Sequence, residues 1–420
     1  MKLSDVIDTF ISGDWGNEHR TKETCNAVFC VRGADIVFIE QSIFSNIPQR
    51  YISDNSFKSK LLQEGDIIIE KSGGSPTQAT GRVVYISKEL IASKQYIVCS
   101  NFCVAFRVKK QWDAYFIYQY WQYIYNNGVF FNFEGKTSGI KNLQLDIALS
   151  TLEIKPYPIE EQRFITSILT SLNTKITLNR VINHNLEAMA KQLYDYWFVQ
   201  FDFPNEEGKP YKSSGGKMVW NEKLKREIPE GWEVLNIFKA MEVQYGFPFA
   251  TELFTEEETT IPIVRIRDII SNTISAYTTE VVDTKYLLHP QDLLIGMDGN
   301  FHINYWNDDK SFLNQRSVRI RAKKDGNVSI IQARYDIEPY IKAKELRTKG
   351  STVGHLSDKD LKELYVTIPS NDYLKLRLDS ILSKIISNRI EISTLTKQRD
   401  ELLPLLMNGQ VSVNYDLSHD

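Results

Sequence analysis

The chain has 420 residues, of which 42% are hydrophobic and 25% charged, and this size and composition predict two or three globular domains. Its net charge of −3 argues against a protein that coats nucleic acid regardless of sequence, although it is compatible with a local basic surface. No apolar run is long enough to span a membrane and the first residues lack a secretory pattern, which predicts a soluble, cytoplasmic protein.

The four cysteines all lie in the first quarter of the chain, at Cys25, Cys30, Cys99 and Cys103. Their spacings fit a zinc site poorly, because zinc-binding pairs usually have two intervening residues. The histidines are scattered, without the spacing of metal ligands. We therefore expect reduced, partly buried thiols and no metal on this chain.

Residues 1–152 are predicted to form a mixed α/β domain. Short β-branched runs such as 66–69 and 82–86 alternate with turns that contain Gly, Ser, Pro or Asn. The aromatic residues between Trp112 and Phe133 have the three-to-four spacing of one helix face. This spacing favours core packing over the alternative, a platform for stacking bases.

Residues 153–202 are predicted to form a long helix. Apolar residues recur there at alternating three- and four-residue steps, which is typical of a coiled-coil seam. Asparagines stand in that seam, where polar residues usually specify partner or register. Four seam residues are candidate contacts for a partner protein: Ile176, Asn179, Asn183 and Leu186. The alternative is that the seam only packs inside the chain.

Residues 203–232 are predicted to be a linker with docked ends. Its centre is rich in Gly, Ser, Lys and Pro, as linkers often are. Trp220 and Trp232 lie beyond that centre, and a linker without anchors would not need them.

Residues 233–368 are predicted to form a second mixed domain that repeats the first. Three segments of it resemble earlier ones, namely 264–269 and 31–36, 291–295 and 65–69, and 314–321 and 100–107. The loops between these segments are not alike. Two domains with one scaffold and different loops would recognise different things.

Residues 369–413 are predicted to form a second long helix, followed by a tail at 414–420. The stretch 384–389 repeats 175–180, and the matching candidate partner contacts are Ile385, Asn388, Ile392 and Leu395. The whole pattern predicts an α+β fold. In it, two similar mixed α/β domains are separated by two long antiparallel coiled-coil helices about a pseudo-twofold axis.

Six motifs in chain order resemble those of the specificity subunits of type I restriction-modification enzymes. They read PIEEQR at 158–163, NR at 179–180, LYDYWF at 193–198, FDFP at 201–204, PYKSSGG at 210–216 and IPEGW at 228–232. The resemblance spans nearly the whole chain. One departure is the entry to the second long helix at 369–375, which lacks the Glu-Gln pair of the first.

This resemblance implies a non-catalytic chain that recognises an asymmetric DNA target in two halves, one for each target-recognition domain. It implies double-stranded DNA, two methyltransferase subunits docked on the helices, and restriction subunits with motor and nuclease activity as partners. S-adenosylmethionine, ATP and magnesium would bind to those partners, and no cofactor to this chain.

Candidate DNA contacts lie in loops after matched strands, where the two domains diverge. Asn and Gln pair bidentately with adenine and Arg with guanine, whereas cationic and hydroxyl groups suit phosphates. In the first domain the candidates are Lys71, Ser72, Ser75, Thr77 and Gln78, with Lys136, Thr137, Ser138 and Lys141 as phosphate clamps. In the second domain they are Asn300, Asn304, Tyr305, Asn314, Gln315, Arg316 and Arg319, with Ser351, Thr352 and His355 as clamps. Asp298 and His302 belong to the same stretch. For any single residue, a solvated loop is the alternative.

Arg319 and Arg321 would share one face of a strand. Such a basic ribbon suits contact with DNA, and a solvated edge strand is the alternative.

No active site is expected. Asp66, Glu70 and Lys71 superficially resemble a metal-nuclease strand, but the second domain has Gly296 and Met297 where Glu70 and Lys71 stand. The sequence also lacks a P-loop and an adenine-methyltransferase motif. The alternative functions are a specificity subunit of a type IIB-like methylase-nuclease fusion, a coiled-coil scaffold without a DNA role, and a stand-alone nuclease.

Overall fold

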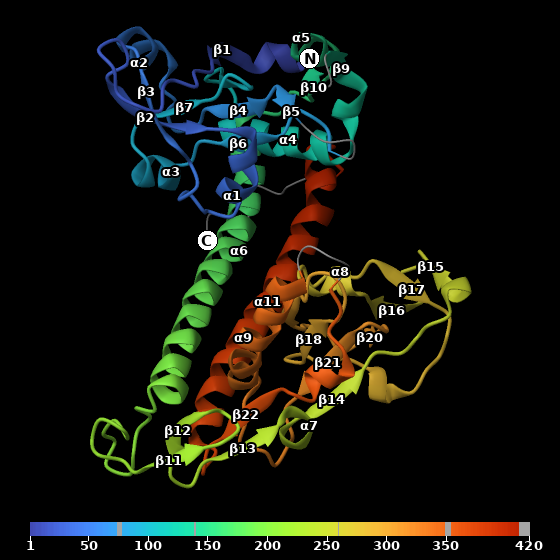
Figure 1. Ribbon diagram of the computed structural model, residues 1–420. Coiled ribbons are helices and arrows are strands. Elements are labelled where there is room, and N and C mark those ends of the chain that lie inside the picture. Colours follow the sequence, from blue (N-terminus) through green and yellow to red (C-terminus); the bar gives the residue numbers. More distant parts are fainter. Residues whose placement is uncertain (74–77, 138–139, 259, 349–353, 411–420) are drawn as a thin grey trace, which may run out of the picture. The chain divides into compact units, whose positions relative to one another are not determined.

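A computed structural model of the chain describes residues 1–73, 78–137, 140–258, 260–348 and 354–410. The contacts divide the chain into two units, and Figure 1 colours it from one end to the other. The first unit comprises Met1–Leu178 with Thr394–Asp420, and the second comprises Asn179–Ser393. No helix in the described ranges is long and apolar enough to cross a membrane.

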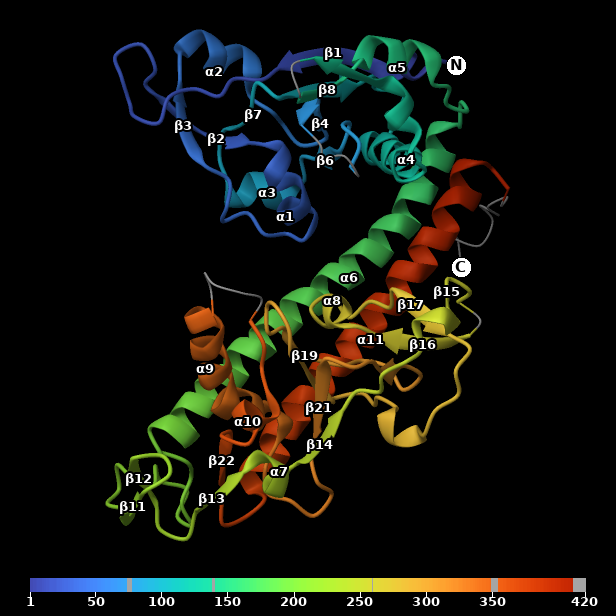
Figure 2. The same cartoon turned by 45° about the vertical axis from the view of Figure 1, so that its right-hand side comes forward.

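A four-stranded antiparallel sheet forms the centre of the first unit. Its order is β1-β8-β4-β6, with bounds Ile7–Ser12, Cys103–Val108, Ile67–Glu70 and Val83–Tyr85. Helix α4 (Ala114–Asn126) packs on one face of this sheet through Phe116 and Trp121, which are fully buried (Figure 2). The aromatic run is therefore core, as its helical spacing predicts.

The opposite face of that sheet is covered by a second layer. Ile68 of β4 packs there with Val31 of strand β2 and Leu90 of helix α3. The strand order in this layer is β3-β2-β7, and β5-β10-β9 form a further small sheet. The remaining elements of the domain are β2 (Asn26–Val31), β3 (Gln49–Ile52), β5 (Ser72–Gly73), β7 (Ile97–Cys99), β9 (Glu134–Thr137), β10 (Ile140–Leu143), α1 (Ile36–Glu40), α2 (Asp54–Lys60), α3 (Lys88–Ser93) and α5 (Leu145–Thr151).

The second unit repeats this topology. Its central sheet has the order β14-β21-β18-β19, with bounds Glu242–Tyr245, Ser317–Arg321, Leu293–Gly296 and Ile303–Tyr305. A second sheet, β15-β17-β16-β20, contains one parallel pair, β16 with β20, just as β2 pairs in parallel with β7. Its bounds are Phe254–Thr255, Ala276–Thr278, Ile261–Val264 and Phe312–Leu313. The predicted duplication of a mixed α/β domain is confirmed.

Two short strand pairs and four helices complete the second unit. They are β11 (Met218–Asn221) with β12 (Arg226–Pro229), β13 (Glu233–Asn236) with β22 (Tyr365–Ile368), α7 (Ile237–Ala240), α8 (Ile266–Ile269), α9 (Ile330–Thr348) and α10 (Asp358–Leu361).

A buried ion pair occupies the same place in both domains. Arg107 of β8 donates to both carboxylate oxygens of Asp66 at 2.8 and 2.9 Å, and Arg321 of β21 donates to those of Asp292 at 2.6 and 2.7 Å. Asp66 and Asp292 are only 0% and 1% exposed. Each ion pair joins the two central strands of its own domain at one end, so the same contact stabilises the central sheet in both domains.

Two long helices, α6 (Ile159–Tyr194) and α11 (Tyr373–Met407), contribute to both units. Each is long enough to carry the predicted seam over many turns. The last turns of α6 pass into a π-helical segment at Asp195–Val199, in which Trp197 and Phe198 are buried.

Within the second unit the two helices run antiparallel. Asn179 donates to Glu391 at 2.8 Å, and four residues later Asn183 donates to the carbonyl oxygen of Ile385 at 3.1 Å. Asn183 also accepts from Asn388 at 2.8 Å. The seam asparagines therefore bond to the other helix of the same chain. This confirms the predicted fold class of two mixed domains with long antiparallel helices.

The same contacts correct the prediction that the seam binds a partner. Six of its eight predicted residues are buried: Ile176, Asn179, Asn183, Ile385, Asn388 and Leu395. Leu186 and Ile392 are half-buried. Because these side chains already pack inside the chain, the seam is intramolecular core.

The linker is docked by a stack of aromatic rings. Phe203 stacks on Tyr211 at 4.7 Å and on Trp232 at 4.9 Å between ring centroids. Trp232 is buried, as predicted, whereas Trp220 is 58% exposed and is not an anchor.

The four cysteines are free thiols, and Cys30, Cys99 and Cys103 are buried. Burial raises the pKa of Cys30 to about 12 and that of Cys103 to about 11, so both thiols stay protonated at neutral pH.

Candidate nucleic-acid interface

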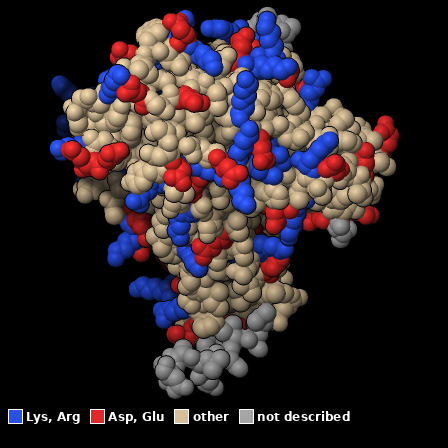
Figure 3. Space-filling model, turned by 90° about the horizontal axis from the view of Figure 1, so that it is seen from below, with Lys and Arg blue, Asp and Glu red and all other residues tan. Residues whose placement is uncertain are grey.

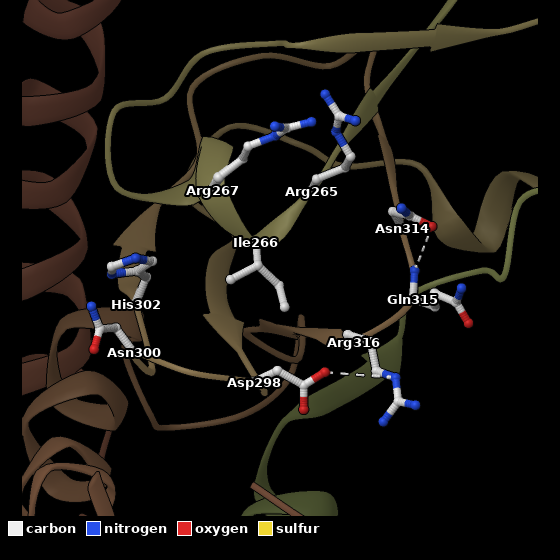
Figure 4. A pocket seen from close by; sticks show the side chains of 9 residues that line it. All are labelled: Arg265, Ile266, Arg267, Asp298, Asn300, His302, Asn314, Gln315 and Arg316. Atoms are coloured by element: carbon white, nitrogen blue, oxygen red, sulfur yellow. Dashed lines mark hydrogen bonds and ion pairs between the residues drawn. The ribbon is translucent and has the colours of Figure 1, made fainter. Parts of the chain in front are cut away.

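A pocket of about 470 Å³ opens in the second unit, at the ends of its central strands. Figure 4 shows the nine residues that line it: Arg265, Ile266, Arg267, Asp298, Asn300, His302, Asn314, Gln315 and Arg316. They come from the start of α8, from the turn between β18 and β19, and from the turn before β21. Three separate segments thus converge on one site.

The start of α8 supplies two of the cations. The backbone N–H of Arg265 donates to the carboxylate of Asp268 at 2.9 Å, so this buried aspartate caps the short helix and fixes its first residues. The Arg265 guanidinium donates to the side-chain oxygen of Ser275 at 2.6 Å. Burial and the neighbouring Arg267 lower the pKa of Arg265. Two positive groups are therefore held close together at the mouth of the pocket.

The turn before β21 supplies a third cation. Arg316 has φ 65, in the left-handed region that non-glycine residues rarely adopt, and its carbonyl oxygen accepts from Met297 at 2.9 Å. Its Nε lies 3.7 Å from the carboxylate of Asp298. Asp298 is also 2.6 Å from Nδ1 of His355. Backbone strain of this kind is concentrated at functional sites.

Amide side chains complete the rim. Gln315 and Asn300 are exposed, and Asn314 is half-buried with its side-chain oxygen accepting from the Gln315 N–H at 2.8 Å. The structure therefore brings together four of the predicted DNA contacts, Asn300, Asn314, Gln315 and Arg316. Arg265 and Arg267 were not predicted from the sequence, although they stand in the segment 264–269 that repeats 31–36.

Three other predicted contacts, Tyr305, Arg319 and Asn304, do not line the pocket. Tyr305 is 3% and Arg319 is 6% exposed, and Arg319 donates to the carbonyl oxygens of Lys285 and Leu287 at 3.1 Å. These two predictions are wrong, because a base or phosphate does not reach a buried side chain. The partner of Arg319 on the expected ribbon, Arg321, is held by its buried ion pair.

The side chain of Asn304 is also engaged in hydrogen bonds within the chain. Its amide donates to the carbonyl oxygens of Ile269 and Ile270 at 3.0 Å each, at the end of α8. Its side-chain oxygen accepts from Arg389 of α11 at 3.1 Å, and Arg389 also donates to Glu187 of α6 at 2.9 Å. Asn304 therefore positions α8 against the long helices, which corrects its prediction as a base reader.

The predicted contacts of the first domain are less concentrated. Lys71 is exposed, whereas Ser72 donates to Asn142 at 2.5 Å and Gln78 is half-buried. Lys141 pairs with Glu134 at 2.9 Å, so it is not a free phosphate clamp. Lys136 and Thr137 lie in strand β9. Ser75, Thr77, Ser138, Ser351 and Thr352 lie outside the described residues.

The two acidic residues that resemble those of a metal-nuclease strand, Asp66 and Glu70, form ion pairs with arginines. Asp66 pairs with Arg107, and Glu70 accepts from Arg82 at 2.7 and 2.8 Å. Both carboxylates are buried, so they are not arranged to hold a metal ion. Throughout the described part of the chain, no three His, Cys, Asp or Glu side chains form a group that could hold a metal.

Charges of both signs are interspersed on the surface. On the face drawn in Figure 3, Lys and Arg alternate with Asp and Glu over the described residues. Such a surface suits local contacts better than a broad basic face would.

Comparison with known proteins identifies the family. The profile of the type I restriction modification DNA specificity domain matches residues 2–188 and 229–403, once for each repeat. The chain belongs to this family.

Two relatives and one solved structure agree with this family assignment. The chain is 27% identical over 184 residues to the type I restriction enzyme EcoBI specificity subunit of Escherichia coli, a match that covers 43% of this chain and 37% of that one. It is 26% identical over 293 residues to the MjaIX specificity subunit of Methanocaldococcus jannaschii, covering 63% and 62%. The matches thus span less than two thirds of the length of these relatives. The crystal structure of the type I S subunit from M. genitalium shares the fold, with TM-score 0.55, 16% identity and coverage of 99% and 96%.

Proposed function

We propose that this chain is the non-catalytic DNA-recognition subunit of a type I restriction-modification complex and reads an asymmetric target in two halves. The observation that carries the proposal is the pocket of the second unit, in which Arg, Asn and Gln side chains from three segments meet. These are the side chains that pair with guanine and adenine in the major groove.

The two domains would read different half-sites. Their central sheets have the same strand order, but the residues at the strand ends differ. Base contacts made by those residues would give each half-site its own sequence, while the shared scaffold would give both the same approach to the duplex.

Methyltransferase partners would dock on the outer face of the helices, since the seam is occupied. Ile182 and Met189 stand seven residues apart on α6 and are each 41% exposed, and Tyr196, in the π-helical segment that follows, is 38% exposed. Val181 and Val199 add to this apolar surface at 46% and 48% exposure. Residues seven apart on an α-helix share a face, so Ile182 and Met189 form an apolar stripe on α6 that suits a hydrophobic partner.

The chemistry would lie on the partners. Methylation of a base in duplex DNA requires its extrusion, which a methyltransferase subunit would perform with its S-adenosylmethionine. ATP and magnesium would serve the restriction subunits. The helices would hold the two domains so that the methyltransferases modify one adenine in each half-site, in the cytoplasm where the DNA lies.

A methylation map of a host that expresses this chain with its neighbouring methyltransferase gene tests the proposal. We expect modified adenines at one asymmetric, split motif. The double variant Asn314→Ala with Arg316→Ala should abolish or relax one half of the motif only. Lys239→Gln, on α7 outside the pocket, is the matched control and should leave the motif unchanged. A host with both proteins expressed and no motif would favour the scaffold alternative.

A further inference from the structure

The last residue of the second central strand differs between the two domains. In the first domain Glu70 ends β4, and its carboxylate accepts two hydrogen bonds from Arg82. In the second domain Gly296 and His302 stand in the same register as Glu70 and Arg82. The backbone N–H of Glu70 donates to the carbonyl oxygen of Arg82 at 2.8 Å, and that of Gly296 donates to the carbonyl oxygen of His302 at 2.9 Å. The carboxylate is therefore missing at this place in the second domain.

A size exchange explains how the space is filled. A Cβ added at Gly33 would lie 2.2 Å from Oε1 of Glu70, so the carboxylate occupies the place of a side chain at 33. Its counterpart in the second domain is Ile266, and a Cβ at Gly296 would lie 2.9 Å from the Ile266 side chain. Each domain thus pairs a glycine with a larger residue at the same two positions. The exchange restores volume but not negative charge.

The positive charge is balanced in the first domain. Arg32 donates to both oxygens of Asp35 at 2.8 and 2.9 Å, and Arg82 is paired with Glu70. Ala34 stands where the second domain has Arg267. Both arginines of this strand-end region are therefore neutralised by carboxylates of the chain itself.

The positive charge is balanced less closely in the second domain. The Nε of Arg265 is buried without a hydrogen-bond partner among the described residues and lies 3.9 Å from Asp268, whose carboxylate caps α8 and accepts from Ser275. Arg267 is exposed, and no carboxylate in the described ranges forms an ion pair with it. Asp298, the acidic residue among those that line the pocket, faces Arg316 and His355. The exposed Arg267 guanidinium, together with the N–H groups of Arg265 that do not bond to Ser275, thus remains available to an external acceptor.

We infer that Arg265 and Arg267 bind an acceptor-rich group of the DNA in this pocket, and that the matching place in the first domain is closed by its own Glu70–Arg82 pair. The inference rests on the proposed DNA-reading function. The O6 and N7 atoms of guanine and the oxygens of a backbone phosphate offer the same chemistry, two adjacent acceptors for a guanidinium. Arg265 and Arg267 are thus the specificity or anchoring residues of the second half-site only.

The test uses the purified complex with its methyltransferase and a fluorescent duplex that carries the mapped motif. The double variant Arg265→Gln with Arg267→Gln should bind this duplex about 10- to 100-fold more weakly than the wild type. The exchange variant Ile266→Gly with Gly296→Glu should weaken binding comparably, because it places the carboxylate of the first domain in the pocket. Lys239→Gln should bind like the wild type, and thermal melting of each variant checks that the domain is folded.

Two modified duplexes distinguish the acceptors. If 7-deazaguanine in the second half-site weakens binding by the wild type but not by the double variant, the acceptor is a guanine edge. If a methylphosphonate linkage there has that effect, the acceptor is a phosphate. The inference is overturned if the folded double variant binds as tightly as the wild type, or if neither modification reduces the difference between them. A complex that binds no motif at all would instead overturn the proposed function.

Discussion

The two domains use the same buried contact to hold the sheet and different contacts at its strand ends. Asp66–Arg107 and Asp292–Arg321 join equivalent strands with equivalent geometry. A few residues away, Glu70 has no counterpart, because Gly296 stands in its place. Carboxylates that repeat are therefore part of the scaffold, and those that do not repeat mark where the domains diverged.

The largest expected effect tests the repeated contact. Asp66→Ala and Asp292→Ala should each destabilise their own unit by about 3–5 kcal/mol, because each leaves a partly buried arginine without its partner. Chemical denaturation with separate fluorescent reporters in the two units measures this. Equal losses would confirm that the contact is scaffold in both domains. A loss of stability in only one unit would show that the two ion pairs share their geometry but not their contribution to stability.

The titration of one aspartate should lower the stability of the second unit as the pH rises. Burial raises the pKa of Asp379, on α11, to about 6 from its ordinary 3.8, while Lys375 opposes the shift. Between about pH 4 and 6 the folded chain therefore binds a proton that the unfolded chain has released, so stability falls as the pH rises through this window. The fall should reach at most about 2 kcal/mol, because the site is partly exposed and screened. Denaturation at several pH values measures it, and Asp379→Asn should remove this contribution to the pH dependence.

The repeated segments made the fold predictable. The strand runs at 66–69 and 291–295 repeat each other and the two helices carry their own period, so the duplicated domain and the two long helices followed from the pattern. The coiled-coil seam was predictable as a seam, but not its partner. Alternating steps do not state whether Asn183 meets Asn388 of its own chain or a residue of another protein.

The site was predictable only where it follows a matched strand. Asn314, Gln315 and Arg316 were found because the repeated segment 314–321 begins there, whereas Arg265 and Arg267 were missed because a helix of four residues has no readable period. Arg319 was misplaced for another reason. Alternation along a strand gives two faces, but the short 3-10 helix Thr284–Tyr286 covers the face that the sequence suggested was open.

The links from the long helices to the domains differ between the units. In the second unit Arg389 reaches Asn304, which holds the end of α8 beside the pocket. In the first unit Arg399 bonds to Asn173 at 3.2 Å, and Asn173 bonds to Tyr115 of α4 at 3.0 Å, within the core-packing helix. The link of the second unit thus ends beside candidate DNA contacts, whereas the link of the first unit ends in the core.

We therefore expect Arg389→Ala to lower the preference for target over random duplex by roughly 0.5–2 kcal/mol, because α8 loses its support. Arg399→Ala is the matched variant and should leave this preference unchanged while it lowers the stability of the first unit. Competition binding of both duplexes to the complex measures the preference. Equal effects of the two variants would show that the helices act on both domains alike.

The smallest expected effect concerns one register position at the strand ends. Phe102 and Arg316 each precede the last central strand, and the carbonyl oxygen of each accepts a backbone N–H, from Lys71 at 2.8 Å and from Met297 at 2.9 Å. Phe102 is 58% exposed, so it offers an apolar contact where Arg316 offers a charge. Arg316→Ala should weaken binding and reduce the slope of log affinity against log salt by about 1. Phe102→Ala should weaken binding with the slope unchanged, because no counterion is released at an apolar contact. Binding isotherms over a salt series measure both slopes, and a lower slope for Phe102→Ala would mean that the first domain uses charge at this position as well.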